Sequence, residues 1–359
     1  LLKRWISAPL KKVEPILVRQ TAVAELFKNK ELRLRIYSLL DEIGDLERLI
    51  SKICTGRANP RELIFLKTSL KKIPDIILHL EKCFAEPLIS LKGKLNPLVH
   101  LVEKLDKALV DNPPLNIADG GVIRNGFSIE LDEIRDISFS GKDWIAQLQK
   151  TERERTGISS LKVSYNKVFG YYIEISHANK DKVPTDYIRK QTLVNSERYI
   201  TPDLKDYEEK VLNAEEKIYE LESQLFNELR LLVASESEAI QTNAKTIAIL
   251  DCYISFAISA DEYNYVKPIV NESNILDIKE GRHPVVERIL PPGEKYTPNN
   301  CFLDNEENQI IVLTGPNMAG KSVFLRQVGL TVLLAQIGSF VPAKEATIGL
   351  IDRIFTRVG

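Results

Sequence analysis

The eight residues from 315 to 322 constrain the fold of this chain most. They match the pattern GxxxxGK(S/T) and read Gly315, Pro316, Asn317, Met318, Ala319, Gly320, Lys321 and Ser322. In this pattern the glycines let backbone N–H groups face a phosphate, and the positive end of the next helix points the same way. Lys321 can then reach the β- and γ-phosphates of ATP, or the β-phosphate of ADP, and the Ser322 hydroxyl can bind Mg²⁺.

The residues on either side of the motif fit an α/β nucleotide-binding portion. An apolar run over 309–314 predicts a strand at Ile310–Leu313, and the pattern over 321–337 predicts a helix that ends at Gly338. A further strand is predicted over 347–355. Strand, loop, helix and strand form a βαβ unit. The alternative is a strand–helix turn that is glycine-rich for structural reasons alone.

The chain lacks the acids that nucleotide hydrolysis needs. A P-loop enzyme uses carboxylates to hold Mg²⁺ and to orient water, usually at the end of a later apolar strand. Only Glu345 and Asp352 follow Ser322, and neither ends an apolar run. We therefore predict no catalytic residue within this chain. The chain starts at leucine, and its only methionine is Met318, so we expect a piece of a longer protein whose catalytic half lies beyond residue 359.

The rest of the chain predicts a mainly helical protein of two or three domains. Apolar residues recur every three or four positions up to about residue 110, and Pro60 and Pro74 are expected to start helices. A helix is predicted from about 128 to 155. Another starts at Thr201-Pro202-Asp203 with near-heptad spacing, which fits either ordinary helix packing or a coiled coil.

A short β-containing insert is predicted over about 156–200, where apolar and polar residues alternate in two runs. Between 150 and 205 eleven Lys and Arg face seven acids, in a chain whose net charge is −1. This surplus suits contact with the phosphate backbone of DNA, although a solvated face explains the composition equally well. The candidate DNA-backbone residues are Lys162, Asn166, Lys167, Arg189, Lys190, Gln191, Asn195 and Arg198.

Cysteine use and hydropathy fit a protein of the reducing cytoplasm. The four cysteines are scattered and form no CxxC pair, so free thiols are expected. No apolar run approaches the length of a membrane span, and no signal peptide opens the chain. We therefore predict no membrane partner.

Longer segments resemble one family. The motif with its flanks, TGPNMAGKS followed by FLRQVGLTVLLAQIGSFVPA, resembles the ATPase domain of the MutS family of DNA mismatch repair proteins. The runs RERTGISSLKVSYNKVFGYYIEIS and RKQTLVNSERYITPDLKDYEEKVL are similar to the same family. The resemblance covers essentially the whole chain. It implies a helical lever over 1–149 and 205–268, a DNA clamp over 150–204, and the first part of an ABC-type ATPase domain over 269–359.

The resemblance also implies ligands and partners. Tyr296 falls where the family places an aromatic ring against adenine, and Asn317 falls within the phosphate loop. Mismatched double-stranded DNA, a second MutS-like subunit and a MutL-like protein are the implied partners, in the bacterial cytosol. The family's mismatch-reading domain, connector, signature motif and acidic pair are missing here. Two alternatives remain: another ABC-type ATPase with helical arms, such as a chromosome-maintenance protein, or a helical scaffold with a vestigial P-loop.

Overall fold

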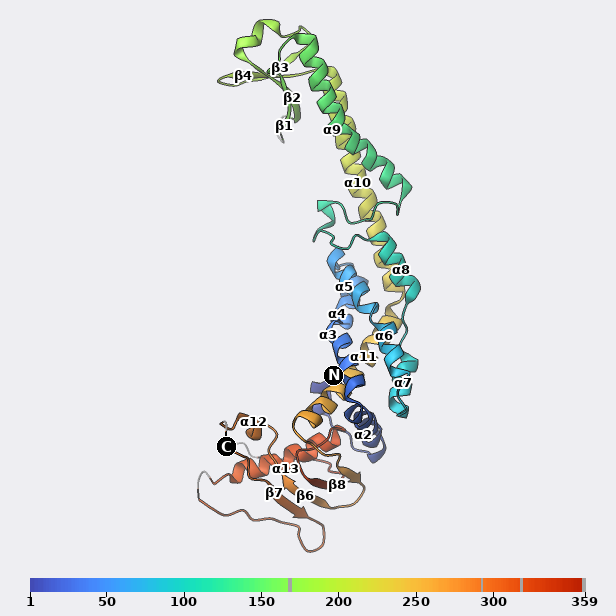
Figure 1. Ribbon diagram of the computed structural model, residues 1–359, viewed down its shortest axis with the longest axis vertical. Coiled ribbons are helices and arrows are strands. Elements are labelled where there is room, and N and C mark those ends of the chain that lie inside the picture. Colours follow the sequence, from blue (N-terminus) through green and yellow to red (C-terminus); the bar gives the residue numbers. More distant parts are fainter. Residues whose placement is uncertain (167–169, 292, 317–318, 357–359) are drawn as a thin grey trace. The chain divides into compact units, whose positions relative to one another are not determined.

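The computed structural model describes the chain except for residues 167–169, 292, 317–318 and 357–359, and except for the side chains of 137–143 and 211. The chain divides into two compact units (Figure 1). The first unit contains Leu1–Ser51, Thr68–Leu98 and Glu236–Gly359, and the second contains Lys52–Lys67 and Val99–Ser235. Within the described part of the chain, no helix is long and apolar enough to cross a membrane.

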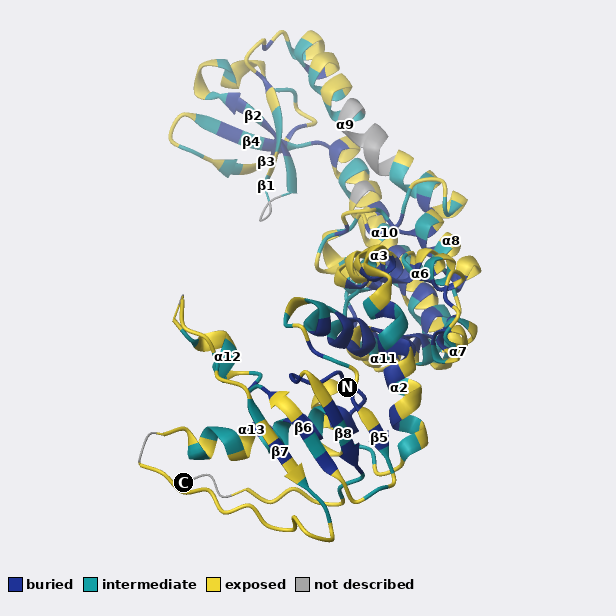
Figure 2. Cartoon of the chain, turned by 60° about the horizontal axis from the view of Figure 1, so that its bottom comes forward, coloured by how far each residue is buried: buried dark blue, intermediate teal, exposed yellow. Residues whose placement is uncertain are grey.

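The helical part of the first unit is built around α11, Ser237–Glu262, which packs against α2, α3 and α7. Many residues of α11 are buried, as the dark blue of this helix in Figure 2 shows. The predicted starts at Pro60 and Pro74 are confirmed, because α5 begins at Pro60 and α6 has Pro74 in its first turn. The helices before α11 are α1 (Leu2–Ser7), α2 (Val13–Lys28), α3 (Lys30–Asp41), α4 (Leu46–Cys54), α5 (Pro60–Leu70), α6 (Ile73–Leu80) and α7 (Glu86–Lys94).

The first unit also holds a small mixed sheet with the order β5-β8-β6-β7. Strands β5 and β8 are parallel, whereas β6 is antiparallel to both β8 and β7. The core under the sheet joins Ile278, Val332 and Ile348 to Ile16 of α2, so the first helices share a core with the sheet. The elements are β5 (Ile269–Asn271), β6 (Leu276–Gly281), α12 (Val286–Ile289), β7 (Asn299–Leu303), α13 (Lys321–Gln336) and β8 (Glu345–Gly349).

The strand predicted before the phosphate loop is wrong. Residues 310–313 form no strand, and Ile310 and Val312 are 83% and 79% exposed. A strand exists only when a neighbouring strand satisfies its backbone groups, and the described residues contain no strand that pairs with this run. The strand predicted over 347–355 forms only as β8, and the βαβ unit is therefore not present in the described chain. The predicted helix is confirmed as α13, and Gly338 follows it at φ 87°.

The second unit is a pair of long helices that carries a sheet. Helices α9 (Ile129–Thr156) and α10 (Pro202–Ser235) pack against each other, with α8 (Val99–Ala108) and a 3₁₀ turn at Ile117–Asp119 on α10 (Figure 1). The predicted start of α10 is confirmed, because the Thr201 hydroxyl accepts a hydrogen bond from the Leu204 N–H at 3.2 Å. Helix α10 ends at Ser235, and a separate helix, α11, begins at Ser237.

The insert between α9 and α10 contains the second sheet, which is antiparallel throughout and has the order β1-β2-β4-β3. Its strands are β1 (Lys162–Asn166), β2 (Gly170–Ser176), β3 (Ile188–Thr192) and β4 (Ser196–Ile200), with a 3₁₀ segment at His177–Lys182. The two runs predicted from alternation are β1 and β2, and they are confirmed. Strands β3 and β4 were not predicted, because their charged residues mask the alternation. The prediction of a mainly helical chain is thus confirmed, and the described part of the chain also contains two small sheets.

Candidate functional site

The phosphate loop leads directly into α13. Gly315 and Gly320 have φ values of 146° and 86°, which side chains with a Cβ rarely adopt, and Gly320 is the N-cap of α13. The Lys321 ammonium donates to the carbonyl oxygens of Gly315 and, at 2.9 Å, of Pro316. Ser322 is exposed in the first helical turn. Lys321 therefore already lies over the loop where a phosphate would bind. The predicted residues Asn317 and Met318 lie outside the described residues.

A hollow of about 710 Å³ lies beside this loop, and Tyr296 lines it too. The hollow is lined by Ala319, Gly320 and Lys321 from the loop and by Tyr296 from the segment between α12 and β7. The Tyr296 hydroxyl donates to Gln327 Oε1 of α13 at 2.7 Å. Partial burial raises the pKa of the Tyr296 hydroxyl. An aromatic ring and a phosphate loop in one hollow are what a nucleoside polyphosphate requires.

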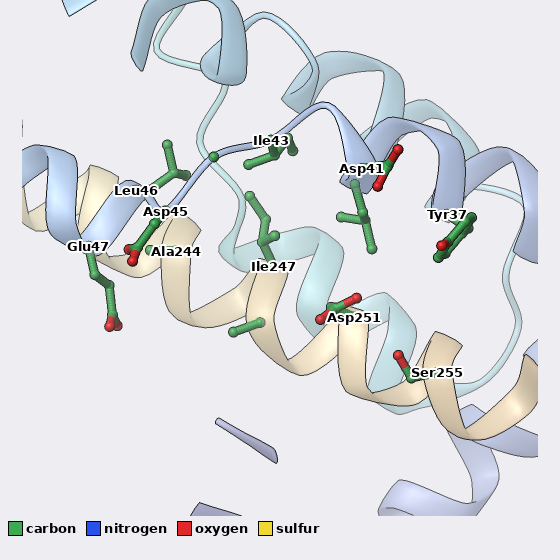
Figure 3. Close-up of a pocket in the computed structure, with 13 residues that line it drawn as sticks. Tyr37, Asp41, Ile43, Asp45, Leu46, Glu47, Ala244, Ile247, Asp251 and Ser255 are labelled. Atoms are coloured by element: carbon green, nitrogen blue, oxygen red, sulfur yellow. The ribbon is translucent and has the colours of Figure 1, made fainter. Parts of the chain in front are cut away.

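A second hollow, of about 550 Å³, lies between the end of α3 and α11 (Figure 3). Its floor is apolar, but Asp41, Asp45 and Asp251 line it together with Glu47. Four carboxylates repel phosphate groups at neutral pH. The hollow beside the phosphate loop, which is lined by both Tyr296 and Lys321, is the candidate nucleotide site.

The sheet of the second unit carries a polar row on the face opposite its core. Lys162, Glu174, Arg198 and Gln191 lie side by side across β1, β2, β4 and β3. Arg198 donates to Gln191 Oε1 at 2.9 Å and to Glu174 Oε2 at 3.4 Å, and its guanidinium stands 4.3 Å from the centre of the Tyr172 ring. The structure thus brings three predicted residues into one row, in which Arg198 is hydrogen-bonded to both neighbours.

The other predicted DNA residues are spread around this sheet. Lys190 is exposed on β3, and Asn195 is exposed in the turn between β3 and β4. Asn166 ends β1, while Lys167 lies outside the described residues. Arg189 is different, because it stands opposite Tyr199, whose side chain belongs to the core. The described candidates are thus divided among the polar row, the turn between β3 and β4, and the position of Arg189 opposite Tyr199.

Sequence reasoning missed Glu197, which lies under the basic sheet. Its side chain is 3% exposed and accepts hydrogen bonds from the Tyr199 hydroxyl and from Lys180 Nζ at 3.1 Å. Arg189 Nη1 lies 3.6 Å from the same carboxylate. These partners, the Tyr199 hydrogen bond first, lower the pKa of Glu197. In the sequence Glu197 only subtracts from the positive surplus, and no spacing marks it as a buried anchor for two cations.

Replacing Glu197 with glutamine should make the sheet less stable at neutral pH. The folded-state pKa of Glu197 lies below its ordinary value of 4.5, so its contribution to stability is present above that value and is lost as pH falls through the folded pKa. We expect the thermal midpoint of Glu197→Gln to lie below that of the wild type at pH 7, with a difference that shrinks below pH 4.5. Asp186→Asn, which removes the exposed partner of Arg155, is the control and should change little. A difference that persists in acid would contradict this role for the carboxylate.

The described chain thus has two characteristic parts. One is a pair of long helices that carries a small polar sheet, and the other is a glycine-rich loop that begins a helix beside a second sheet. These parts fit a multidomain protein with a candidate nucleotide site and a separate polar sheet. A model of MutS domain III matches residues 1–257, and a model of MutS domain V matches residues 311–359. DNA mismatch repair proteins MutS from Salinibacter ruber and Chlorobaculum tepidum are 51% and 53% identical over the whole chain. The chain belongs to the MutS family. It covers 39% and 41% of the length of these two relatives.

Proposed function

We propose that this chain is the lever, clamp and first ATPase segment of a DNA mismatch repair ATPase. The lever would span 1–149 and 205–268, the clamp 150–204, and the ATPase segment 269–359. The observation that carries the proposal is the shared hollow of Lys321, Gly320 and Tyr296 at the start of α13. ATP or ADP would bind there, with its phosphates on the backbone of residues 315–320 and on Lys321, and with Mg²⁺ on Ser322.

The proposed ligand of the clamp is the phosphate backbone of double-stranded DNA. Lys162 and Lys190 are exposed, and Asn195 offers an uncharged donor in the turn between β3 and β4. Lysine ammonium groups bind phosphates without reading the bases, which suits a clamp that holds any sequence. Arg198 is held by Glu174 and Gln191, so its charge contributes from a fixed position.

Nucleotide binding would reach the helices through the far end of α13. Gln336 Nε2 donates to the Leu10 carbonyl at 2.9 Å and to the Ile351 carbonyl at 3.0 Å. Arg19 Nη1 of α2 donates to the Ile337 carbonyl at 2.9 Å, and α2 packs against α11. A shift of α13 on nucleotide binding would therefore move the N-terminal helices with it.

Within the second unit, an aromatic cluster joins the sheet to its helices. Trp144 of α9 stacks on Tyr207 of α10 with ring centroids 3.9 Å apart, and Tyr171 of β2 meets Tyr207 edge-on at 5.9 Å. Such pairs stabilise a fixed orientation of the sheet on the helix pair. We propose that α10 and this cluster transmit the nucleotide state to the clamp.

The proposed activity of the whole protein is mismatch recognition coupled to ATP. Its DNA substrate would be a mispaired duplex, and its partners would be a second MutS-like subunit and a MutL-like protein, in the bacterial cytosol. Hydrolysis would depend on carboxylates from outside this chain. Of the two acids after Ser322, Glu345 lies 3.0 Å from Lys279 Nζ, and Asp352 follows β8 on the surface.

The affinity for duplex DNA should fall as the salt concentration rises. Each clamp lysine should contribute to the slope of the logarithm of the binding constant against the logarithm of the salt concentration. The logarithm of the binding constant falls by about 0.9 for each phosphate contact per tenfold rise in salt. We expect Lys162→Ala and Lys190→Ala each to reduce the slope by about 1 for a random-sequence duplex. Lys245→Ala, which removes an exposed lysine of α11, should leave the slope unchanged. Equal slopes for all four proteins would contradict the clamp assignment.

A further inference from the structure

Gln327 is an unusual residue for the buried side of α13. Its side chain is fully buried, and its Oε1 accepts the hydrogen bond from Tyr296. Its Nε2 is also buried and has no hydrogen-bond partner among the described residues. A buried amide with one unmatched donor destabilises a core in which methionine or leucine would fill the same space. What Gln327 provides that methionine or leucine could not is the hydrogen bond to Tyr296.

The first sheet leaves room for this side chain at Gly281. A Cβ on Gly281 would lie 2.5 Å from Gln327 Nε2 and 2.8 Å from Ile278 Cγ2, closer than real Cβ atoms approach. Gly281 does not have a positive φ, so space rather than backbone conformation requires glycine here. Asn299, which pairs with Gly281 across β6 and β7, follows Tyr296 by three residues. Gly281, Gln327 and Tyr296 therefore form one packed group from β6, α13 and the loop before β7.

The hydrogen bond to Gln327 fixes the far end of the Tyr296 ring. The ring lines the same hollow as Lys321 and Gly320. A stacking platform is most effective when its ring is already oriented, because no rotational freedom is then lost on binding. We propose that Gln327 is a positioning residue that holds Tyr296 as the platform for the base of the nucleotide. The site would thereby distinguish a nucleoside triphosphate from a bare polyphosphate. This inference rests on the proposed nucleotide site.

The test compares two ligands of the full-length protein, Mg-ATP and Mg-tripolyphosphate, which share the phosphates but not the base. Gln327→Met should bind ATP about three- to tenfold more weakly and tripolyphosphate as the wild type does. Tyr296→Phe, which keeps the ring but not the tether, should show the same loss. Tyr296→Ala should lose about tenfold or more for ATP alone. The thermal midpoint of Gln327→Met should not fall, since the unmatched donor is gone.

Thr331→Val is the matched control. Thr331 is buried one turn further along α13, and among the described residues its hydroxyl bonds only to the Gln327 backbone carbonyl, at 2.9 Å. It should bind both ligands as the wild type does. Wild-type affinity of Gln327→Met for ATP, or an equal loss for both ligands, would overturn the positioning role. A wild-type protein that binds neither ligand would instead overturn the nucleotide site itself.

Discussion

Replacing Lys321 with alanine is expected to lower the affinity for ATP by about a hundredfold or more. In the proposed complex the ammonium donates to two phosphates, and a hydrogen bond between charged groups contributes about 1.5–3 kcal/mol. Two such bonds correspond to at least about 3 kcal/mol, and each 1.4 kcal/mol is a factor of ten. The lost contacts to the Gly315 and Pro316 carbonyls lie at the surface, so folding should change little. Isothermal titration with Mg-ATP measures the effect.

Lys295→Ala is the matched control for this experiment. Lys295 lines the same hollow and is exposed, but it lies outside the phosphate loop. If Lys321 acts through specific phosphate contacts, Lys295→Ala should weaken ATP binding by no more than about threefold, as expected for an exposed charge. Comparable losses for the two variants would show that general positive charge, rather than the loop, attracts the nucleotide. They would contradict the P-loop assignment.

Helices of this protein could be predicted from sequence because their signals are local. Proline at Pro60 and Pro74, the Thr201 cap and the glycine after α13 each act within one turn. The run at 310–313 has equally strong local signals for a strand, yet it forms none. A strand depends on partners elsewhere in the chain, which its own residues do not reveal. Strands β3 and β4 were missed for a different reason, because their charged residues mask the alternation of apolar and polar positions.

The candidate sites were predictable to different degrees. The phosphate loop has a fixed spacing, so Lys321 and Ser322 could be assigned from sequence alone. The prediction of Tyr296 came only from a family resemblance, and in the structure Tyr296 lines the same hollow as Lys321. Glu197 and Gln327 carry no sequence signal, because their significance lies in burial and in partners contributed by other elements. Buried residues that position the side chains of a site can thus be identified only from a structure.

A buried ion pair in the second unit is expected to give the largest stability effect. Glu222 of α10 is 1% exposed and accepts from Arg135 of α9 and from the Val122 N–H at 3.3 Å. Arg135 also donates to the Ile123 carbonyl at 2.8 Å and to Asn125 Oδ1 at 2.7 Å. The pair therefore ties α9, α10 and the turn segment at 122–125 together.

Arg135→Met should lower the free energy of unfolding by about 3–5 kcal/mol, because it leaves the Glu222 carboxylate buried without its cation. Urea denaturation at pH 7, followed by circular dichroism of the helices, measures this change. Arg35→Met removes the exposed pair with Glu31 on α3, whose side chains are 61% and 77% exposed. That control should change the free energy by no more than about 1 kcal/mol.

The double variant Arg135→Met with Glu222→Met separates two explanations for such a loss. If the single variant is unstable because a charge is left unpaired, removing that charge should restore most of the stability, since apolar residues of similar size often replace a buried pair at little cost. A deficit of roughly 1 kcal/mol should remain, because the Val122 N–H loses its acceptor. If the double variant is instead as unstable as Arg135→Met, the hydrogen bonds of Arg135 to residues 123 and 125 dominate. The guanidinium would then stabilise the unit mainly by fixing this turn segment rather than by neutralising Glu222.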